Sequence, residues 1–154
     1  MKKIGMKMMK NKQRGSFVLE ALIAILLFAI GILAIVGLQA ASIGNTAAAK
    51  YRTDASLLAN QVIAQMWVAD KTNATLVACF SGPAVSGVCP PAGTAGANYL
   101  AWASSVAQAL PGVSGVTAPS ITIDASNTAT VTVNWQGPNE SAPHNYSTVA
   151  TIND

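Results

Sequence analysis

Charged and reactive side chains are scarce in this chain of 154 residues, and their scarcity excludes several classes of protein. Only 10% of the residues are charged, and there are two cysteines and one histidine. Catalytic triads and metal centres draw on these residue types, so the sequence predicts no catalytic site, no metal and no other cofactor. In contrast, 51% of the residues are hydrophobic, which indicates that part of the chain lies in a membrane.

The few charges are unevenly distributed. Six of the nine Lys and Arg residues precede Gly15. The remainder of the chain carries three basic and six acidic residues, a net charge of −3, so the formal charge of +3 belongs to the first fifteen residues. Because no basic patch with interleaved aromatic residues occurs elsewhere, we do not expect nucleic-acid binding.

His144 is the single candidate for a general base or a nitrogen ligand. It follows Pro138 in a stretch up to Asn145 that is typical of a loop, and acidic partners are sparse. We therefore expect an exposed loop residue rather than the base of a Cys/His or Ser/His pair. The glycines between Gly82 and Gly96 lack the ending of a phosphate-binding loop.

An uncharged run extends from Ala21 to Ala49, behind the basic N-terminal stretch. Its most apolar part, Ala21–Leu38, approaches the ~20 residues that cross a hydrocarbon layer of ~30 Å. A cleavable secretory signal is one interpretation, but the run exceeds the usual length of ~7–15 residues. An ordinary signal anchor is another. In either case the basic end is expected to stay in the cytoplasm.

Glu20 lies at the start of this run and distinguishes the interpretations. A carboxylate within an apolar segment costs roughly 2–3 kcal/mol on insertion scales, less near an end, and such residues usually have a function. If the chain is cut after Gly15, Glu20 falls in the first turns of a new helix, where the helix dipole favours negative charge. The cut also creates a cationic amino group at Ser16, a partner for Glu20 of a neighbouring subunit.

These residues belong to a recognisable segment. Residues 13–26 read QRGSFVLEALIAIL. The segment resembles the class III signal of type IV prepilins and type II secretion pseudopilins. The resemblance implies that a prepilin peptidase cuts between Gly15 and Ser16 and methylates the new N-terminus at Ser16. Major pilins usually have Phe directly after the cut, whereas this chain has Ser16 there, followed by Phe17.

The resemblance continues to residue 67 and is most similar to the PilV branch of minor pilins. It is carried by four short segments: Gly31–Leu33, Gly37–Gln39, Tyr51–Ala55 and Leu58–Gln61. It implies a structural subunit, not an enzyme, that helps to initiate or modify a type IV pilus. The implied partners are the prepilin peptidase, other minor and major pilins, and the assembly machinery. The implied location is the bacterial inner membrane, with the head in the periplasm, and then the fibre.

Two alternatives remain open at this point. A type II secretion pseudopilin would carry the same leader and the same Glu20. A membrane-anchored periplasmic enzyme or binding protein is the other alternative, and in such a protein the presence of Glu20 would be a coincidence. Adhesion, twitching motility and DNA uptake are likewise not distinguished by the residues.

The rest of the sequence predicts an α+β fold in which a long N-terminal helix packs on a small antiparallel sheet, as in pilins. Tyr51, Ala55, Leu58, Val62 and Met66 recur at helical spacing and form an apolar stripe. The expected parts are a leader at 1–15, a transmembrane half of the helix at 16–40, an amphipathic half at 41–70 and a head at 71–154. The head is expected to contain a loop-rich stretch at 73–96, a short helix at about 99–110, and strands at about 121–124, 129–135 and 147–152.

Cys79 and Cys89 are ten positions apart, which fits neither a CxxC redox motif nor a zinc site. Beyond the membrane, on the non-cytoplasmic side, a disulfide between them is the expected state. Two reduced, buried thiols are the alternative.

The sequence predicts that the mature chain begins at Ser16. Glycine offers the peptidase a site without a side chain, and the family pattern places the cut there. The intact mass of protein extracted from membranes should match residues 16–154, with or without one methyl group. A product that starts near Ala41 or Ile43 would instead indicate a conventional signal peptide.

Overall fold

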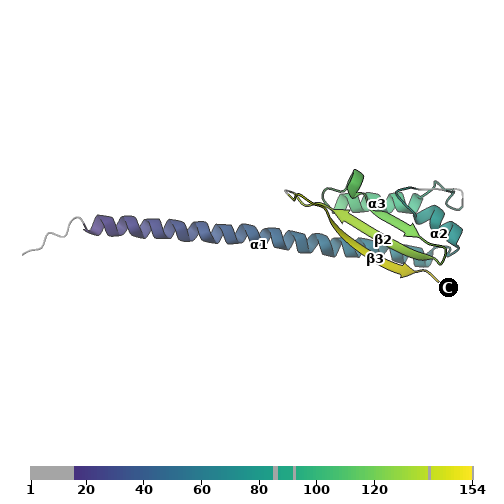
Figure 1. Ribbon diagram of the computed structural model, residues 1–154, viewed down its shortest axis with the longest axis horizontal. Coiled ribbons are helices and arrows are strands. Elements are labelled where there is room, and N and C mark those ends of the chain that lie inside the picture. Colours follow the sequence, from purple (N-terminus) through teal and green to yellow (C-terminus); the bar gives the residue numbers. More distant parts are fainter. Residues whose placement is uncertain (1–15, 85–86, 92, 139, 154) are drawn as a thin grey trace, which may run out of the picture. The chain divides into compact units, whose positions relative to one another are not determined.

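The computed structural model describes residues 16–84, 87–91, 93–138 and 140–153, so the predicted leader at 1–15 lies outside the described residues. The chain divides into two compact units, one ending at Gly44 and one extending from Asn45 to Asp154. The elements are the helices α1 (Ser16–Val68), α2 (Asn73–Phe80) and α3 (Ala97–Ala109), a 3-10 turn η1 (Gly115–Thr117), and the strands β1 (Ser120–Ile123), β2 (Thr128–Trp135) and β3 (His144–Thr151) (Figure 1). A long apolar N-terminal helix is thus combined with a small sheet.

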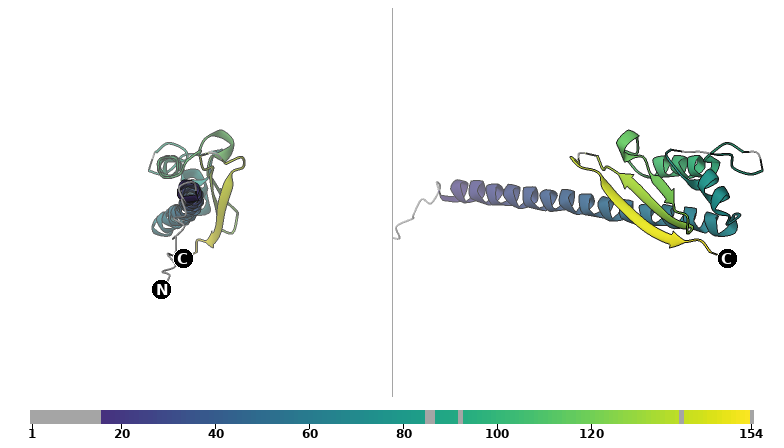
Figure 2. Two further views of the ribbon diagram at one scale, coloured as in Figure 1. Left: turned by 90° about the vertical axis from the view of Figure 1, so that its left-hand side faces the viewer. Right: turned by 45° about the vertical axis from the view of Figure 1, so that its right-hand side comes forward.

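Within the second unit, the last part of α1 supplies one wall of the core. The predicted apolar stripe is confirmed: Ala55, Val62 and Met66 are fully buried and Leu58 is nearly so. On the other side of the helix Asn60, Gln61 and Gln65 are exposed. An apolar stripe on one side of a helix needs only one covering layer. The sheet and α3 provide this layer (Figure 2).

The sheet is antiparallel, in the order β1-β2-β3. Strand β2 alternates as its sequence predicts, with Ala129, Val131, Val133 and Trp135 buried and the residues between them half-buried. The register places Ile121 opposite Val131, and Val133 opposite Tyr146. One face of the sheet therefore joins the core with α1, while the other faces solvent.

A polar turn connects β1 to β2 and fixes their register. The Asp124 carboxylate accepts hydrogen bonds from the backbone N–H and hydroxyl of Ser126 (2.8 and 2.7 Å) and from the backbone N–H of Thr128 (2.8 Å). The bonds from Ser126 and Thr128 hold the pKa of Asp124 below its usual value. Asn127 has a left-handed backbone, with φ of 58°, which Asn tolerates better than most residues.

Two buried aromatic residues tie α3 to its neighbours through their polar atoms. The Trp102 indole N–H donates to the Leu58 carbonyl in α1 (2.8 Å), and the Tyr99 hydroxyl donates to the Pro119 carbonyl (2.7 Å). Burial raises the pKa of Tyr99, so its hydroxyl stays protonated as a donor. Both side chains thus bury apolar area without leaving a polar atom unpaired.

Two expectations about the head are wrong. Residues Asn73–Phe80 form α2 rather than part of a loop, because burial of Leu76, Cys79 and Phe80 in the core stabilises a helix that is only eight residues long. His144 is the first residue of β3 and not a loop residue, because β3 begins three positions before Ser147, where the sequence pattern predicted its start. Its side chain is exposed, as expected.

Gly82 should be the glycine in the head that is most sensitive to substitution. It exchanges two backbone hydrogen bonds with Ile121 (3.0 and 2.9 Å), and a Cβ atom there would overlap the Tyr99 ring. We expect Gly82→Ala to lower the free energy of unfolding by about 1–3 kcal/mol, a typical cost of overpacking. Thermal unfolding of the full chain in detergent measures it. Gly37→Ala is the control, because a Cβ at Gly37 has no atom within 4 Å and should leave the transition unchanged.

Candidate functional site

The first part of α1 presents an unbroken apolar surface. Every Leu, Ile, Val and Phe from Phe17 to Ile43 is exposed, and Phe17 itself is 74% exposed. The helix is long and apolar enough to cross a membrane, and none of its most apolar stretch is buried. Soluble monomers rarely leave a patch of this kind uncovered. This surface therefore needs lipid or other apolar helices around it.

Glu20 is the only charged residue between Phe17 and Ala49, and it lies in the second turn of α1. Its side chain is exposed on the helix. Ser16 is the first residue of α1, whereas Gly15, the other side of the predicted cut, lies outside the described residues. If the chain is cut after Gly15, Ser16 is the first residue of the helix and Glu20 lies close to its positive dipole end.

The head contains the expected disulfide between Cys79 and Cys89, which joins the buried end of α2 to the segment before α3. Both cysteines are buried against the core, at 3% and 6% exposure. Around this link, the backbone N–H of Gly96 donates to the Ala78 carbonyl (2.7 Å). The disulfide therefore holds a stretch that has little regular structure against the rest of the head.

Chemistry-bearing side chains are dispersed over the part of the chain that the structure describes. No group of three or more His, Cys, Asp or Glu residues that could hold a metal lies among residues 16–84, 87–91, 93–138 and 140–153. His144 contacts Glu140, with 3.1 Å between Nε2 and Oε2, and stacks on the Trp135 ring with the centroids 5.8 Å apart. This pair orients the imidazole at the start of β3.

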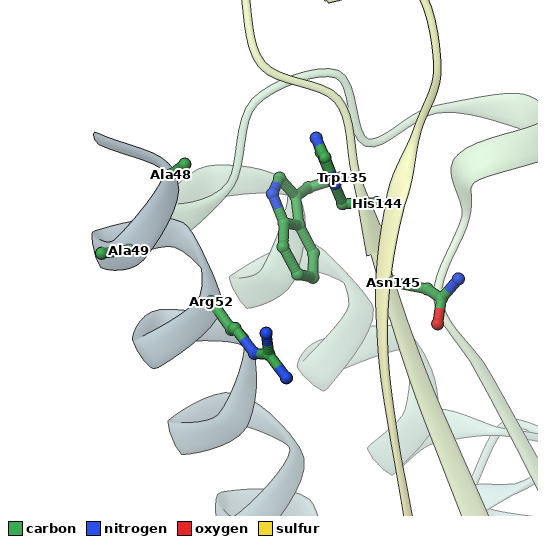
Figure 3. A pocket seen from close by; sticks show the side chains of 6 residues that line it. All are labelled: Ala48, Ala49, Arg52, Trp135, His144 and Asn145. Atoms are coloured by element: carbon green, nitrogen blue, oxygen red, sulfur yellow. The ribbon is translucent and has the colours of Figure 1, made fainter. Parts of the chain in front are cut away.

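Sequence reasoning missed one grouping of residues. Arg52, Trp135 and His144 line the same pocket, together with Ala48, Ala49 and Asn145 (Figure 3). They come from α1, β2 and β3, and Arg52 precedes the other two by more than 80 positions. Only the alternation of β2, which ends in Trp135, signalled that this indole faces α1.

Reduction of the disulfide should destabilise the head. Closing a loop of about 11 residues stabilises a fold by about 2–3 kcal/mol in the chain-entropy model, and we expect reduction to remove that amount from the free energy of unfolding. The measurement is denaturant unfolding with and without reductant. Cys79→Ala/Cys89→Ala should be insensitive to reductant. Alkylation of both wild-type thiols in protein from the periplasmic side, without prior reduction, would contradict the disulfide.

No protein-family model, no curated protein and no solved structure matches this chain.

Proposed function

We propose that the chain is a minor pilin of the PilV kind, a non-enzymatic subunit that helps to initiate or modify a type IV pilus. The observation that carries the proposal is Glu20, a lone carboxylate five positions after Gly15, in the second turn of α1. Every Leu, Ile, Val and Phe side chain of this helix from Phe17 to Ile43 is exposed. An ordinary anchor gains nothing from this charge and bears its cost of insertion. A subunit that assembles through this helix gains an ion-pair partner.

The two environments of such a subunit follow from the surface of α1. Before assembly, the apolar stretch from Phe17 to Ile43 spans the inner membrane, with the basic leader on the cytoplasmic side and the head in the periplasm. After assembly, the same surface packs against equivalent helices of other minor and major pilins. Both environments replace water by apolar contacts, so transfer from one to the other costs little hydrophobic free energy.

Processing supplies the charge that Glu20 needs. A prepilin peptidase cuts between Gly15 and Ser16 and leaves an α-amino group at Ser16, which the same enzyme methylates. In a bundle of helices this cation is in a medium of low polarity, where an unpaired ammonium is costly. Glu20 of an adjacent subunit neutralises it. The pair thereby favours a fixed axial position of one subunit relative to the next.

Replacing Glu20 tests the proposal directly. Glu20→Ala should leave insertion and cleavage intact, because the leader and Gly15 direct cleavage. Incorporation into fibres should fall by orders of magnitude, since the loss of one partner of a buried ion pair costs about 3–5 kcal/mol. The measurement compares processed protein in the inner membrane with protein in sheared surface fibres.

Two further variants distinguish the effect of the Glu20 charge on assembly from the effect of side-chain packing. Glu20→Gln keeps the size and hydrogen-bonding atoms of the side chain and should fail as Glu20→Ala does. Leu22→Ala shortens an exposed apolar side chain nearby on the same helix and should assemble far better than either. Wild-type levels of Glu20→Ala in fibres would remove the assembly role and favour an ordinary membrane anchor.

A further inference from the structure

Strand β3 forms one edge of the sheet, and its outer side carries a row of backbone groups that no described residue pairs with (Figure 1). The Ile152 N–H donates to the Asn127 carbonyl (2.9 Å). These two residues lie one position beyond the last pair of the β2–β3 register, so they are a hydrogen-bonded pair. Because such pairs alternate along an antiparallel ladder, every second residue of β3 directs its N–H and C=O away from β2. These outward residues are Asn145, Ser147, Val149 and Thr151.

The two edges of the sheet differ in their protection. Gly82 covers the outer edge of β1, because it exchanges two backbone hydrogen bonds with Ile121, and it is followed by Pro83, which has no N–H. No strand or bridge within the described residues covers β3, whose sequence contains no Lys, Arg, Asp, Glu or Pro. Natural sheets usually block an open edge with such residues, because the edge can pair with another chain. The outer edge of β3 is therefore accessible to an added strand.

The side chains of β3 would present two different faces to an added strand. The outward residues are all exposed, and the apolar Val149 is 61% exposed. Between them, Tyr146 and Ala150 are half-buried and pack against the core. Side chains of neighbouring strands pack beside each other on the same face of a sheet. An added strand would thus extend the core on one face and meet solvent on the other.

We propose that β3 binds an extended, uncharged segment of another protein, which pairs antiparallel to β3 and continues the sheet. A polypeptide backbone offers N–H and C=O groups at the spacing of the outward residues. Antiparallel pairing continues the alternation of the three strands. Since β3 contains no charged residue, a charge in the segment would gain no partner there. The best match alternates apolar residues on the core face with Thr or Ser on the solvent face.

A second copy of this chain is a poorer match to the β3 edge. Its β1 edge is covered by Gly82, so it would have to pair through its own β3. Antiparallel pairing of two β3 strands makes the second halves of the two α1 helices run in opposite directions, because each packs against its own sheet. Under the function proposed above, on which this step rests, all subunits enter one membrane from the same side. The partner is therefore a different protein.

Backbone amide exchange of the full chain in detergent micelles provides the test. Without a ligand, the outward amides should exchange faster than those of Tyr146, Thr148 and Ala150, which bond to β2. The probe is a blocked octapeptide of alternating Thr and Val, N-methylated at every Val so that only its Thr edge can pair. We expect saturable binding that slows exchange of the outward amides by at least about tenfold, since each gains a hydrogen bond.

A control peptide tests the assignment of the two faces. It has the same sequence, but its N-methyl groups are on the Thr residues, so it can pair only through Val. Its Thr side chains then lie on the core face and its Val side chains in solvent. We expect it to bind at least about fivefold more weakly, because less apolar surface is buried. Equal binding of the two peptides would contradict the proposal.

Two substitutions at one outward residue test the backbone pairing. Val149→Pro removes an outward N–H and should weaken binding by at least about tenfold, whereas Val149→Thr keeps this N–H and should change binding by less than about twofold. Slow exchange at Thr148 and Ala150 shows whether β3 still pairs with β2 in each variant. If Val149→Pro disturbs this pairing, the two peptides on the wild-type chain decide.

Three results would overturn the proposal. The first is that the probe peptide leaves the exchange of the outward amides unchanged, and the second is that the Pro and Thr variants bind it alike with β3 intact. The third is protection of these amides that appears without peptide and increases with protein concentration, which would identify a second copy as the occupant. The test uses protein outside any fibre, so its outcome and that of the Glu20 variants are independent.

Discussion

The two parts of α1 require different surroundings, and the rest of the structure depends on this difference. From Phe17 to Ile43 its apolar side chains point in all directions and none is buried, whereas from Ala55 onward a single stripe is buried under the head. A helix that is apolar all round needs lipid or other helices, but a helix with one stripe needs only one protein layer. The same continuous helix therefore connects a segment for an apolar environment to a folded head.

The head is small, and specific links supplement its limited core. The Cys79–Cys89 disulfide fixes the segment after α2, the Trp102 indole joins α3 to α1, and the Asp124 turn sets the register of β1 and β2. Small domains bury a smaller share of their surface than large ones, so such links contribute a larger fraction of the net stability. Among the described residues, no further strand or bridge pairs with the outer edge of β3.

The proposed assembly role depends on a single unpaired charge. Glu20 has no partner among the residues that the structure describes, and it lies in an apolar surface. In a medium of low polarity this charge has a cost that a cation of another molecule relieves. Natural sequences keep such local conflicts mainly where they serve binding or assembly.

The sequence by itself determined the elements that depend on periodicity and composition: the apolar run, the buried stripe of α1, the presence of the short helix α3 and the alternation in β2. It also identified Glu20, because a lone charge in an apolar run is visible without coordinates. Only the tertiary structure decided that Asn73–Phe80 is a helix and that β3 begins at His144, since burial against the core and pairing with β2 override weak local preferences. The alternation of β2 indicated that the Trp135 indole faces α1, but only the tertiary structure placed Arg52 and Trp135 in the same pocket, because packing of α1 against the sheet brings together residues that lie far apart in the chain.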